Sequence, residues 1–479
     1  MYPYDSPKRR QRRAALLVLL CLVVVAVGFV VGRWSMLLQY PMLKEPVFRN
    51  LDTTYKEIMS DYLDGAEPSS LLHGAAEGMV ASLDDPYSTY YTKERGSSYL
   101  ERYEKSFVGI GVELRQEDGR FLIESVVEGA PAEQAGLLKD DVIIEINNTS
   151  LEGRSLDEIV ELTRGEEGTK VTLTIEREGM QPPFEQVLVR APVPVVTVEH
   201  EMREDGIGTI QIIRFSEDTA TEFDAAVQAL QAEGMRALIL DLRMNPGGLL
   251  RPAIEIASRI VPKDEVIVQV VYKDEQHHVT HRSQQEEPWR LPVVVLVDQN
   301  SASSAEVLAA ALKDSAGIEV VGVKTFGKGI VQTFQQFEDH SVLKLTEAQW
   351  RRADGSWIHE EGIEPTIEVR MPDYASLPSL PSDIEVAVGS YGQHVKTAEQ
   401  LLATLGYEPG EPEGIFDEET KAAVQRFQRD EGLPADGVLS GRASYRLVER
   451  VRDKVIREDP QHQKAVELLT AILAVQEAE

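Results

Sequence analysis

The first hydrophobic pattern in the chain is a continuous apolar run near the N-terminus. Residues 14–32 carry no charge, and this length is close to the ~20 residues that a helix needs to cross a bilayer. The basic residues clustered in the preceding segment, 1–13, hold that end in the cytoplasm. The pattern predicts a single-pass transmembrane helix, with everything after Arg33 outside the cell membrane. A cleaved signal peptide is the alternative.

Helical periodicity follows over residues 45–103. Apolar side chains recur there at intervals of three and four, as in Tyr55, Ile58, Met59 and Tyr62. A second helix is predicted over residues 69–83. We interpret this segment as a packing or dimerisation platform.

Over residues 104–190 the period changes to that of strands. Runs typical of strands lie at residues 121–126, 141–146 and 171–177, and short helices are predicted at residues 130–136 and 155–164. The pattern predicts a small β-rich module.

Strands and helices then alternate over residues 191–372, which predicts a layered α/β core. The expected strands are residues 207–213, 237–242, 266–271, 293–297 and 319–323, and the expected helices are residues 219–232, 250–260 and 303–313. A Ser- and Pro-rich linker is predicted over residues 373–388, a small helical unit over 389–452 and a final helix over 453–479.

Composition narrows the functional classes. A chain of 479 residues implies several domains, and a net charge of −31 excludes nucleic acid as a partner. Cys21 is the one cysteine, so there is no disulfide framework and no thiolate metal site. Gly-x-Ser-x-Gly and His-Glu-x-x-His are both absent. We interpret His277, His278 and His281 as part of an exposed hairpin, and we expect neither a metal nor a cofactor.

The candidate catalytic residues lie mainly between residues 298 and 332. Ser303 follows a predicted strand and begins a predicted helix, so it is either an ordinary N-cap or a nucleophile beside the free N–H groups of a helix N-terminus. The Gly247–Gly248 turn ends another strand and offers further backbone donors. Lys328 lies between two glycines, and burial near groups such as Phe326 would lower the pKa of its amine enough for a general base.

Two segments resemble known binding modules. Residues 107–112 and 130–143 resemble a PDZ domain, which implies that Gly109-Ile110-Gly111-Val112 binds a peptide C-terminal carboxylate and that the peptide adds as a strand. Arg164 lies at the end of the second predicted helix. It is either a residue that responds to a bound peptide or a solvated arginine at a helix end. Residues 391–451 resemble the three-helix peptidoglycan-binding module, although Glu413-Gly414-Ile415-Phe416-Asp417 departs from its usual Asp-Gly-x-Phe-Gly.

Residues 51–369 as a whole resemble the carboxy-terminal processing peptidases. Two motifs carry this resemblance, Ser301-Ala302-Ser303-Ser304-Ala305-Glu306 and Phe326-Gly327-Lys328-Gly329-Ile330-Val331-Gln332. The resemblance implies Ser303 as nucleophile, Lys328 as base, Gln332 as the residue that orients the base, and an oxyanion hole from the N–H groups of Ser304 and of Gly247 or Gly248. Since Ser304-Ala305 replaces the family's Ala-Ser, Ser301 and Ser304 remain alternatives. Gln332 lies four residues after Lys328, so a straight strand would hold it ~13 Å away, and a bend is required.

The sequence therefore predicts a multidomain α/β protein: a layered (crotonase/ClpP-like) serine protease core with an inserted PDZ domain, an N-terminal helical segment and a small all-α C-terminal module. Its expected function is cleavage of proteins near a free C-terminus, outside the membrane, with cell wall as a further partner and a homodimer as the expected assembly. The rival hypotheses are an inactive PDZ and wall-binding scaffold, and a wall hydrolase.

Overall fold

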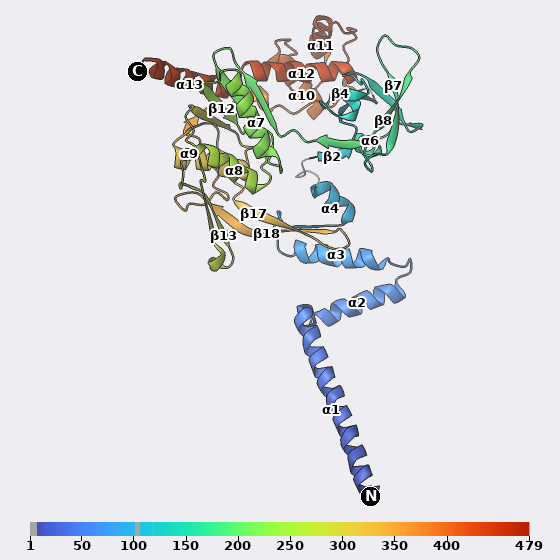
Figure 1. Cartoon of the computed structure of the whole chain (residues 1–479). Coiled ribbons are helices and arrows are strands. Elements are labelled where there is room, and N and C mark those ends of the chain that lie inside the picture. The colour runs from blue at the N-terminus through green and yellow to red at the C-terminus, as the bar shows by residue number, and fades with distance from the viewer. Residues whose placement is uncertain (1–6, 101–105, 118, 479) are drawn as a thin grey trace. The chain divides into compact units, whose positions relative to one another are not determined.

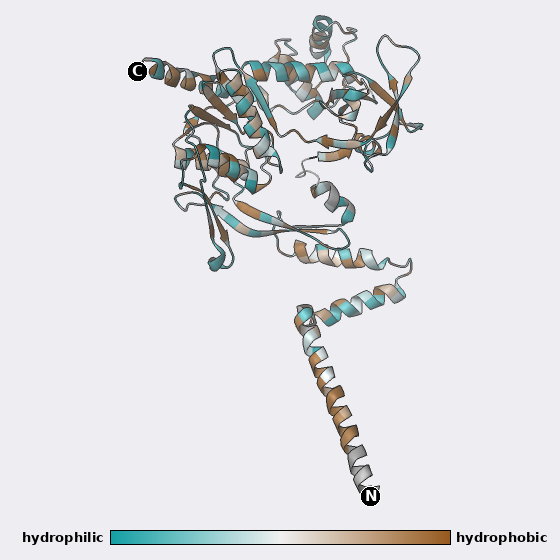
Figure 2. Cartoon of the chain, viewed as in Figure 1, coloured by the Kyte–Doolittle hydropathy of each residue, from teal (hydrophilic) through white to brown (hydrophobic). Residues whose placement is uncertain are grey.

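The computed structural model describes residues 7–100, 106–117 and 119–478 (Figure 1). They fall into two compact units, Met1–Thr92 and Lys93–Glu479. The first unit contains α1 (Pro7–Gln39), the short 3-10 helix η1 (Pro41–Lys44), α2 (Phe48–Asp61), α3 (Pro68–Ala81) and β1 (Thr89–Tyr91). Within α1, the 21 residues Leu16–Met36 are long and apolar enough to cross a membrane, and Figure 2 shows their apolar character along the helix.

The first unit buries little of its apolar surface. Neither α2 nor α3 contains a buried residue among those described. A hydrogen bond of 2.8 Å between His73 Nδ1 and the Tyr90 hydroxyl joins α3 to β1. The two helices predicted in this segment are confirmed, and each has an apolar side that its own unit does not cover.

The second unit begins with α4 (Lys93–Leu100) and a β-rich module. Strands β3 (Val112–Glu117), β4 (Arg120–Val126), β5 (Val142–Ile146), β7 (Lys170–Glu176) and β8 (Phe184–Val189) form its sheet in that order, and β6 (Thr149–Ser150) pairs with β5. Alternate residues of β7 are buried, as expected of a strand with one face on a core. The predicted helices are present as α5 (Pro131–Gln134) and α6 (Leu156–Thr163), and β2 (Ser106–Gly109) pairs with β9 (Ala191–Pro194).

The α/β core is a six-stranded sheet in the order β10-β11-β12-β15-β16-β19. Its strands are β10 (Val198–Met202), β11 (Ile207–Ile212), β12 (Ala237–Asp241), β15 (Val293–Val297), β16 (Glu319–Gly322) and β19 (Ile367–Glu368). All neighbours except β10 and β11 are parallel. One face packs on the three predicted helices, α7 (Thr219–Ala232), α8 (Leu250–Ile260) and α9 (Ser304–Ala316). Because β12 and β15 are buried at every position, their sequences are continuous apolar runs, except for Asp241 at the end of β12.

A second, antiparallel sheet lies beside the core. It contains β17 (Ile330–Gln336), β18 (Val342–Arg351), β13 (Val266–Tyr272) and β14 (Val279–Arg282), which pair in that order, and the 3-10 helix η3 (Glu275–His277) lies between β13 and β14. The apolar run at residues 266–271, expected with the other strands of the core, therefore belongs to another sheet. The hairpin of β17 and β18 was not among the predicted strands.

The C-terminal module has three helices around its own hydrophobic core: α10 (Gln393–Thr404), α11 (Glu418–Asp430) and α12 (Gly441–Arg457). The predicted linker contains the 3-10 helix η4 (Asp373–Ser376), and its residues Leu380 and Val386 are buried in this module's core. The last helix, α13 (Pro460–Ala478), covers the second face of the core sheet, where Ala465 and Leu469 pack with strand residues such as Ile239. The tail helix thus begins at Pro460, later than the predicted residue 453.

Candidate active site

The turn between β15 and α9 is held in place by one buried carboxylate. Asp298 Oδ1 accepts hydrogen bonds of 3.0 Å from the backbone N–H groups of Met244, Asn300 and Ser301. Since Met244 follows β12, Asp298 ties the ends of two neighbouring parallel strands together. Ser303 then adopts φ 57° and ψ −118° and is only 7% exposed. A backbone held in such an unfavourable conformation needs a rigid surrounding, which is typical of functional residues.

The three serines of this turn have different environments. The Ser301 hydroxyl donates to the Leu242 carbonyl (2.8 Å) and accepts from the Asp298 N–H (2.9 Å), so it is engaged in holding the turn. The Ser304 hydroxyl, on the first residue of α9, donates to the Gly248 carbonyl (3.0 Å). Both residues are fully buried. Of the three, Ser303 is the one that combines a small exposure with a backbone in the positive-φ region.

The Gly247–Gly248 turn lies directly against Ser303. Gly247 has φ +94°, and a Cβ built on it would lie 2.7 Å from both the Ala302 oxygen and the Ser303 Cβ. Its N–H donates to Asn245 Oδ1 (2.8 Å) and is therefore already used. By contrast, neither the N–H of Gly248 nor that of Ser304 has an acceptor within the described ranges. Of the three donors expected for an oxyanion hole, two remain available.

A methyl group at Gly247 should therefore displace the nucleophile. For Gly247→Ala we expect kcat to fall by about 10²-fold, because a shift of ~1 Å in a reacting group costs about that much. Gly234→Ala is the matched control: Gly234 has φ +91°, so it carries the same backbone strain, but nothing lies within 4 Å of its added Cβ. Equal loss of kcat in the two variants, measured on folded protein, would contradict the crowding argument.

The geometry of the loop that contains Lys328 requires a glycine on each side of the lysine. Gly327 has φ +90°, and a Cβ on Gly329 would lie 2.2 Å from the His359 backbone nitrogen. The Lys328 carbonyl accepts from Trp350 Nε1 at 3.2 Å, and the residue is half-buried. Phe326, expected to help bury the lysine, is 58% exposed, so the shielding comes from other groups.

One carboxylate joins the nucleophile turn to the lysine loop. Glu306 is fully buried, and its Oε2 accepts hydrogen bonds of 2.8 Å from the backbone N–H of Ser303 and from that of Lys328. Those two nitrogens therefore lie no more than twice that distance apart. Its Oε1 accepts from the Thr325 hydroxyl (2.6 Å) and the Gly327 N–H (2.7 Å). Burial raises the Glu306 pKa, and the four donors partly oppose this rise.

Glu306 was missed as a site residue, although the sequence contained a signal for it. Ser303-x-x-Glu306 has the spacing of a capping box, in which the glutamate at the third helical position accepts from the N-cap N–H. The bonds to residues 325–328 come from a loop distant in sequence and have no signature in the motif.

Gln332 lies at an irregularity of β17. The register between β17 and β18 shifts between Val331 and Gln332, which is the kind of bend that the expected approach to Lys328 requires. The Gln332 side-chain amide donates to Thr346 Oγ1 at 3.4 Å. The bulge and this bond set the position of the amide on the strand.

The predicted carboxylate-binding loop lies between β2 and β3. Its carbonyls are occupied, since Ile110 accepts from the Ala132 N–H (2.8 Å) and Gly111 from the Val127 N–H (3.0 Å). The N–H groups of Ile110 and Gly111 have no acceptor within the described part of the chain, so they can serve an anion. Gly109 ends β2 and Val112 begins β3. Arg164, directly after α6, places its guanidinium 5.3 Å from the Phe107 ring centre, close to this loop.

No group of three histidine, cysteine, aspartate or glutamate side chains suited to a metal occurs among the residues described. Around Ser303 the described groups are backbone N–H donors, the buried Glu306 carboxylate and the loop that contains Lys328.

Comparison with known proteins agrees with this organisation. The chain matches the models of Peptidase family S41 over residues 206–369, a PDZ domain over 122–177, a peptidoglycan binding domain over 391–443 and the activating protease CtpB N-terminal domain over 41–95. Carboxy-terminal processing protease CtpA of Bacillus subtilis (strain 168) is 39% identical over 464 residues, covering 96% of this chain and 99% of that protein.

A second relative is carboxy-terminal processing protease CtpB of the same organism, 35% identical and covering 86% of each chain. Among solved structures, the photosystem II D1 C-terminal processing protease aligns with a TM-score of 0.41 at 25% identity, covering 69% of this chain and 89% of that one. The chain is thus a C-terminal processing serine peptidase with a PDZ domain and a peptidoglycan binding domain. It belongs to peptidase family S41 and is a homologue of CtpA and CtpB.

Proposed function

We propose that this peptidase is anchored in the cell membrane by α1 and cleaves proteins near their C-termini outside the cytoplasm, with Ser303 as nucleophile and Lys328 as general base. The observation that carries the proposal is the Glu306 carboxylate, one oxygen of which binds the backbone N–H groups of both residues. The parallel core sheet with α7–α9 on one face supports a layered, crotonase/ClpP-like core.

In the proposed reaction, Lys328 Nζ takes the proton of Ser303 Oγ, and the oxygen attacks the scissile carbonyl carbon. The N–H groups of Gly248 and Ser304 stabilise the resulting oxyanion, while Gly247 allows the close approach of the turn. The lysine then gives its proton to the leaving amine, and water releases the acyl group from Ser303. Gln332 orients the lysine amine from β17.

Substrate selection is assigned to the PDZ domain. The N–H groups of Ile110 and Gly111, which have no acceptor among the described residues, support binding of a C-terminal carboxylate. A peptide strand would add beside β3, with its carboxylate at the loop from Gly109 to Val112 and Arg164 close to that loop. Arg164 would then respond to the bound tail. The membrane anchor and the peptidoglycan binding domain would keep the enzyme between membrane and wall, and the exposed apolar sides of α2 and α3 support a homodimer.

A free carboxylate should make a peptide a better substrate. We expect kcat/KM for a peptide with a free C-terminus to exceed that for its C-terminal amide by about 10–100-fold, because hydrogen bonds to a charged group contribute about 1.5–3 kcal/mol. The full chain in detergent, incubated with both peptides and analysed by mass spectrometry, tests this. Equal rates would refute carboxylate recognition. Degradation of purified cell wall in the same assay would favour the wall-hydrolase alternative over wall binding.

A further inference from the structure

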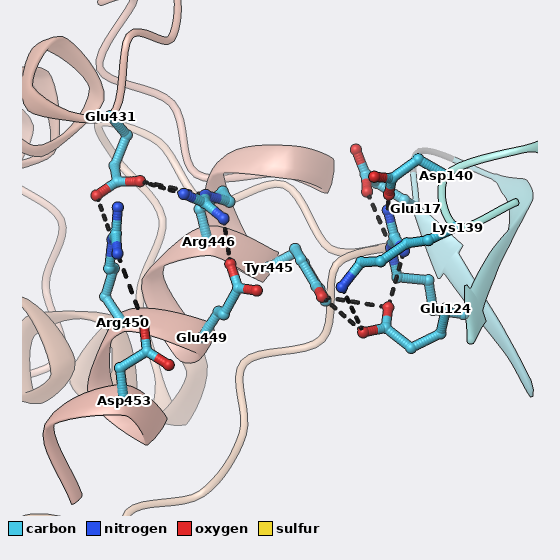
Figure 3. Close-up of polar contacts among 11 residues, drawn as sticks. Glu117, Glu124, Lys139, Asp140, Glu431, Tyr445, Arg446, Glu449, Arg450 and Asp453 are labelled. Carbon is cyan, nitrogen blue, oxygen red and sulfur yellow. Dashed lines mark hydrogen bonds and ion pairs between the residues drawn. The ribbon is translucent and has the colours of Figure 1, made fainter. Parts of the chain in front are cut away.

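The C-terminal module contacts the PDZ domain through one arginine of β3. Arg115 Nη1 donates to Glu124 (2.8 Å) and Nη2 to Asp140 (2.5 Å), and its side chain is 14% exposed. The ring of Tyr445, on α12, has its centre 4.7 Å from the Arg115 Cζ. Figure 3 shows the Tyr445 hydroxyl reaching Glu124, to which it donates at 3.0 and 3.2 Å. Burial and Glu124 raise the Tyr445 pKa to about 12, so the hydroxyl keeps its proton.

A second contact reaches the backbone of the same strand. The Ser382 hydroxyl donates to the Gln116 carbonyl at 2.5 Å. Ser382 lies between Leu380 and Val386, both of which are buried in the core of the C-terminal module. The module therefore holds two consecutive residues of β3, the strand that follows the carboxylate-binding loop.

The other end of α12 leads to the oxyanion turn. Asp459, two residues after the end of α12, accepts from Arg243 Nη1 at 2.6 Å, and Gln461 accepts from the same atom at 3.1 Å. Arg243 is also bound by Asp241 (2.6 Å) at the end of β12. Arg243 lies two residues before Asn245 and four before Gly247. This ion-pair cluster therefore fixes the start of the segment that forms the turn at Gly247 and Gly248.

Between these ends α12 is a continuous helix of 17 residues, ~26 Å long at 1.5 Å per residue. It is braced along its length within its own module: Leu447 and Val451 are buried, and Glu431 accepts from both Arg446 (2.9 Å) and Arg450 (2.6 Å), as Figure 3 shows. These contacts fix α12 within its module.

We propose that α12 is a strut that couples the peptide-binding strand β3 to the oxyanion turn. A substrate tail that adds to β3 shifts or stiffens Arg115 and Gln116, and α12 transmits this change to Arg243 and the turn at Gly247. The C-terminal module thereby has a second role besides wall attachment, as a positioning element of the peptidase. This inference rests on the proposed function of the PDZ domain and the Ser303 site.

The coupling predicts non-additive kinetics. Tyr445→Phe removes the bond to Glu124, and Asp459→Asn weakens the ion pair at the other end. We expect each variant to lower the kcat/KM advantage of a free-carboxylate peptide over its amide by about fivefold or more, the lower range of measured coupling between sites. In the double variant, the kcat/KM advantage should fall no further than in the more affected single variant. The reason is that loss of either contact already interrupts the coupling through α12. Losses that multiply, as they do for independent sites, would overturn the proposal.

A matched control lies in the same module but off α12. Tyr407→Phe removes the hydrogen bond of 3.0 Å from the Tyr407 hydroxyl to Asp430, which stays within the module, and it should leave the carboxylate advantage unchanged. A loss as large as that of Tyr445→Phe would show that any weakening of the module acts this way, and the strut would be overturned.

Hydrogen exchange separates this inference from the proposed chemistry. In the full-length Ser303→Ala protein, a free-carboxylate peptide should slow exchange at residues 112–117 and at residues 242–248. With Tyr445→Phe added, protection should persist at residues 112–117 and disappear at 242–248. Equal protection of both segments in the two proteins would overturn the strut. Absence of protection at residues 112–117 would refute tail binding itself, and with it the signal that the strut carries.

Discussion

Replacement of Ser303 by alanine should abolish peptide cleavage, with a fall in kcat/KM of about 10⁴-fold or more. The reason is the loss of the hydroxyl that we propose as the nucleophile, while the proposed oxyanion donors, the N–H groups of Gly248 and Ser304, remain. Because a Ser303→Ala side chain fits the space of the serine, the melting temperature and the affinity for a free-carboxylate peptide should stay close to those of the wild-type protein. Mass spectrometry of the digested peptide and fluorescence anisotropy of peptide binding measure the two effects.

The neighbouring serines provide matched controls of the same size. Ser304→Ala removes a bond to the Gly248 carbonyl, so we expect a loss of activity of at most about tenfold. Ser301→Ala leaves the Leu242 carbonyl and the Asp298 N–H without their partner, which should cost about 1–3 kcal/mol of unfolding free energy. Full activity in Ser303→Ala together with inactivity of a folded Ser304→Ala protein would move the nucleophile to Ser304.

The parts of the fold that could be predicted are those in which burial leaves a periodic trace. Helices α7 and α8 begin and end at the predicted residues, and β15 matches its apolar run. Pairing partners leave no such trace. The run at β13 is as apolar as a core strand, yet it pairs antiparallel with β14 and β18 in another sheet, and nothing in its own residues distinguishes the two cases.

The C-terminal helix illustrates the same limit. The apolar side of this helix is recognisable in the sequence. Such a pattern predicts that one side of the helix is buried, but not which surface buries it. That surface is the second face of the core sheet, where Leu469 packs with Ile239 more than two hundred residues away in the sequence. Likewise, Leu380 and Val386 lie in a stretch whose composition is that of a linker, and only the tertiary fold places them in a core.

At the candidate site, motif spacing predicts Ser303 and Lys328 as the reacting residues, but it does not predict which contacts hold their backbones together. The spacing of Ser303 and Glu306 indicates an ordinary capping box, but it does not indicate the further bonds of Glu306 to Thr325, Gly327 and Lys328. The same holds for Asn245, which occupies the N–H of Gly247 and so changes the donors that remain for an oxyanion. The hydrogen bonds of Glu306 and of Asn245 both depend on which backbone groups the tertiary structure brings next to these side chains.

Glu306→Gln should test whether the hydrogen bonds of Glu306 to the Ser303 turn and the Lys328 loop are needed for a high kcat. A carboxylate accepts all four hydrogen bonds that reach it, whereas an amide offers one carbonyl oxygen and turns an NH₂ group toward two of the donors. The turn at Ser303 and the loop at Lys328 would lose their shared acceptor. We expect kcat to fall by about 10²–10³-fold, with the unfolding free energy lowered by on the order of 3 kcal/mol.

The control for this prediction is a second buried glutamate, in the C-terminal module. Glu399 is 1% exposed, and it accepts from the Gly414 N–H (2.9 Å) and the Thr420 hydroxyl (3.3 Å). Burial raises its pKa, as it does for Glu306. Glu399→Gln should therefore lower the melting temperature without a comparable loss of kcat, and both variants should bind a free-carboxylate peptide as the wild type does. If Glu306→Gln loses stability but keeps kcat, then Glu306 is a structural residue only, and the proximity of Ser303 and Lys328 must be maintained by other contacts.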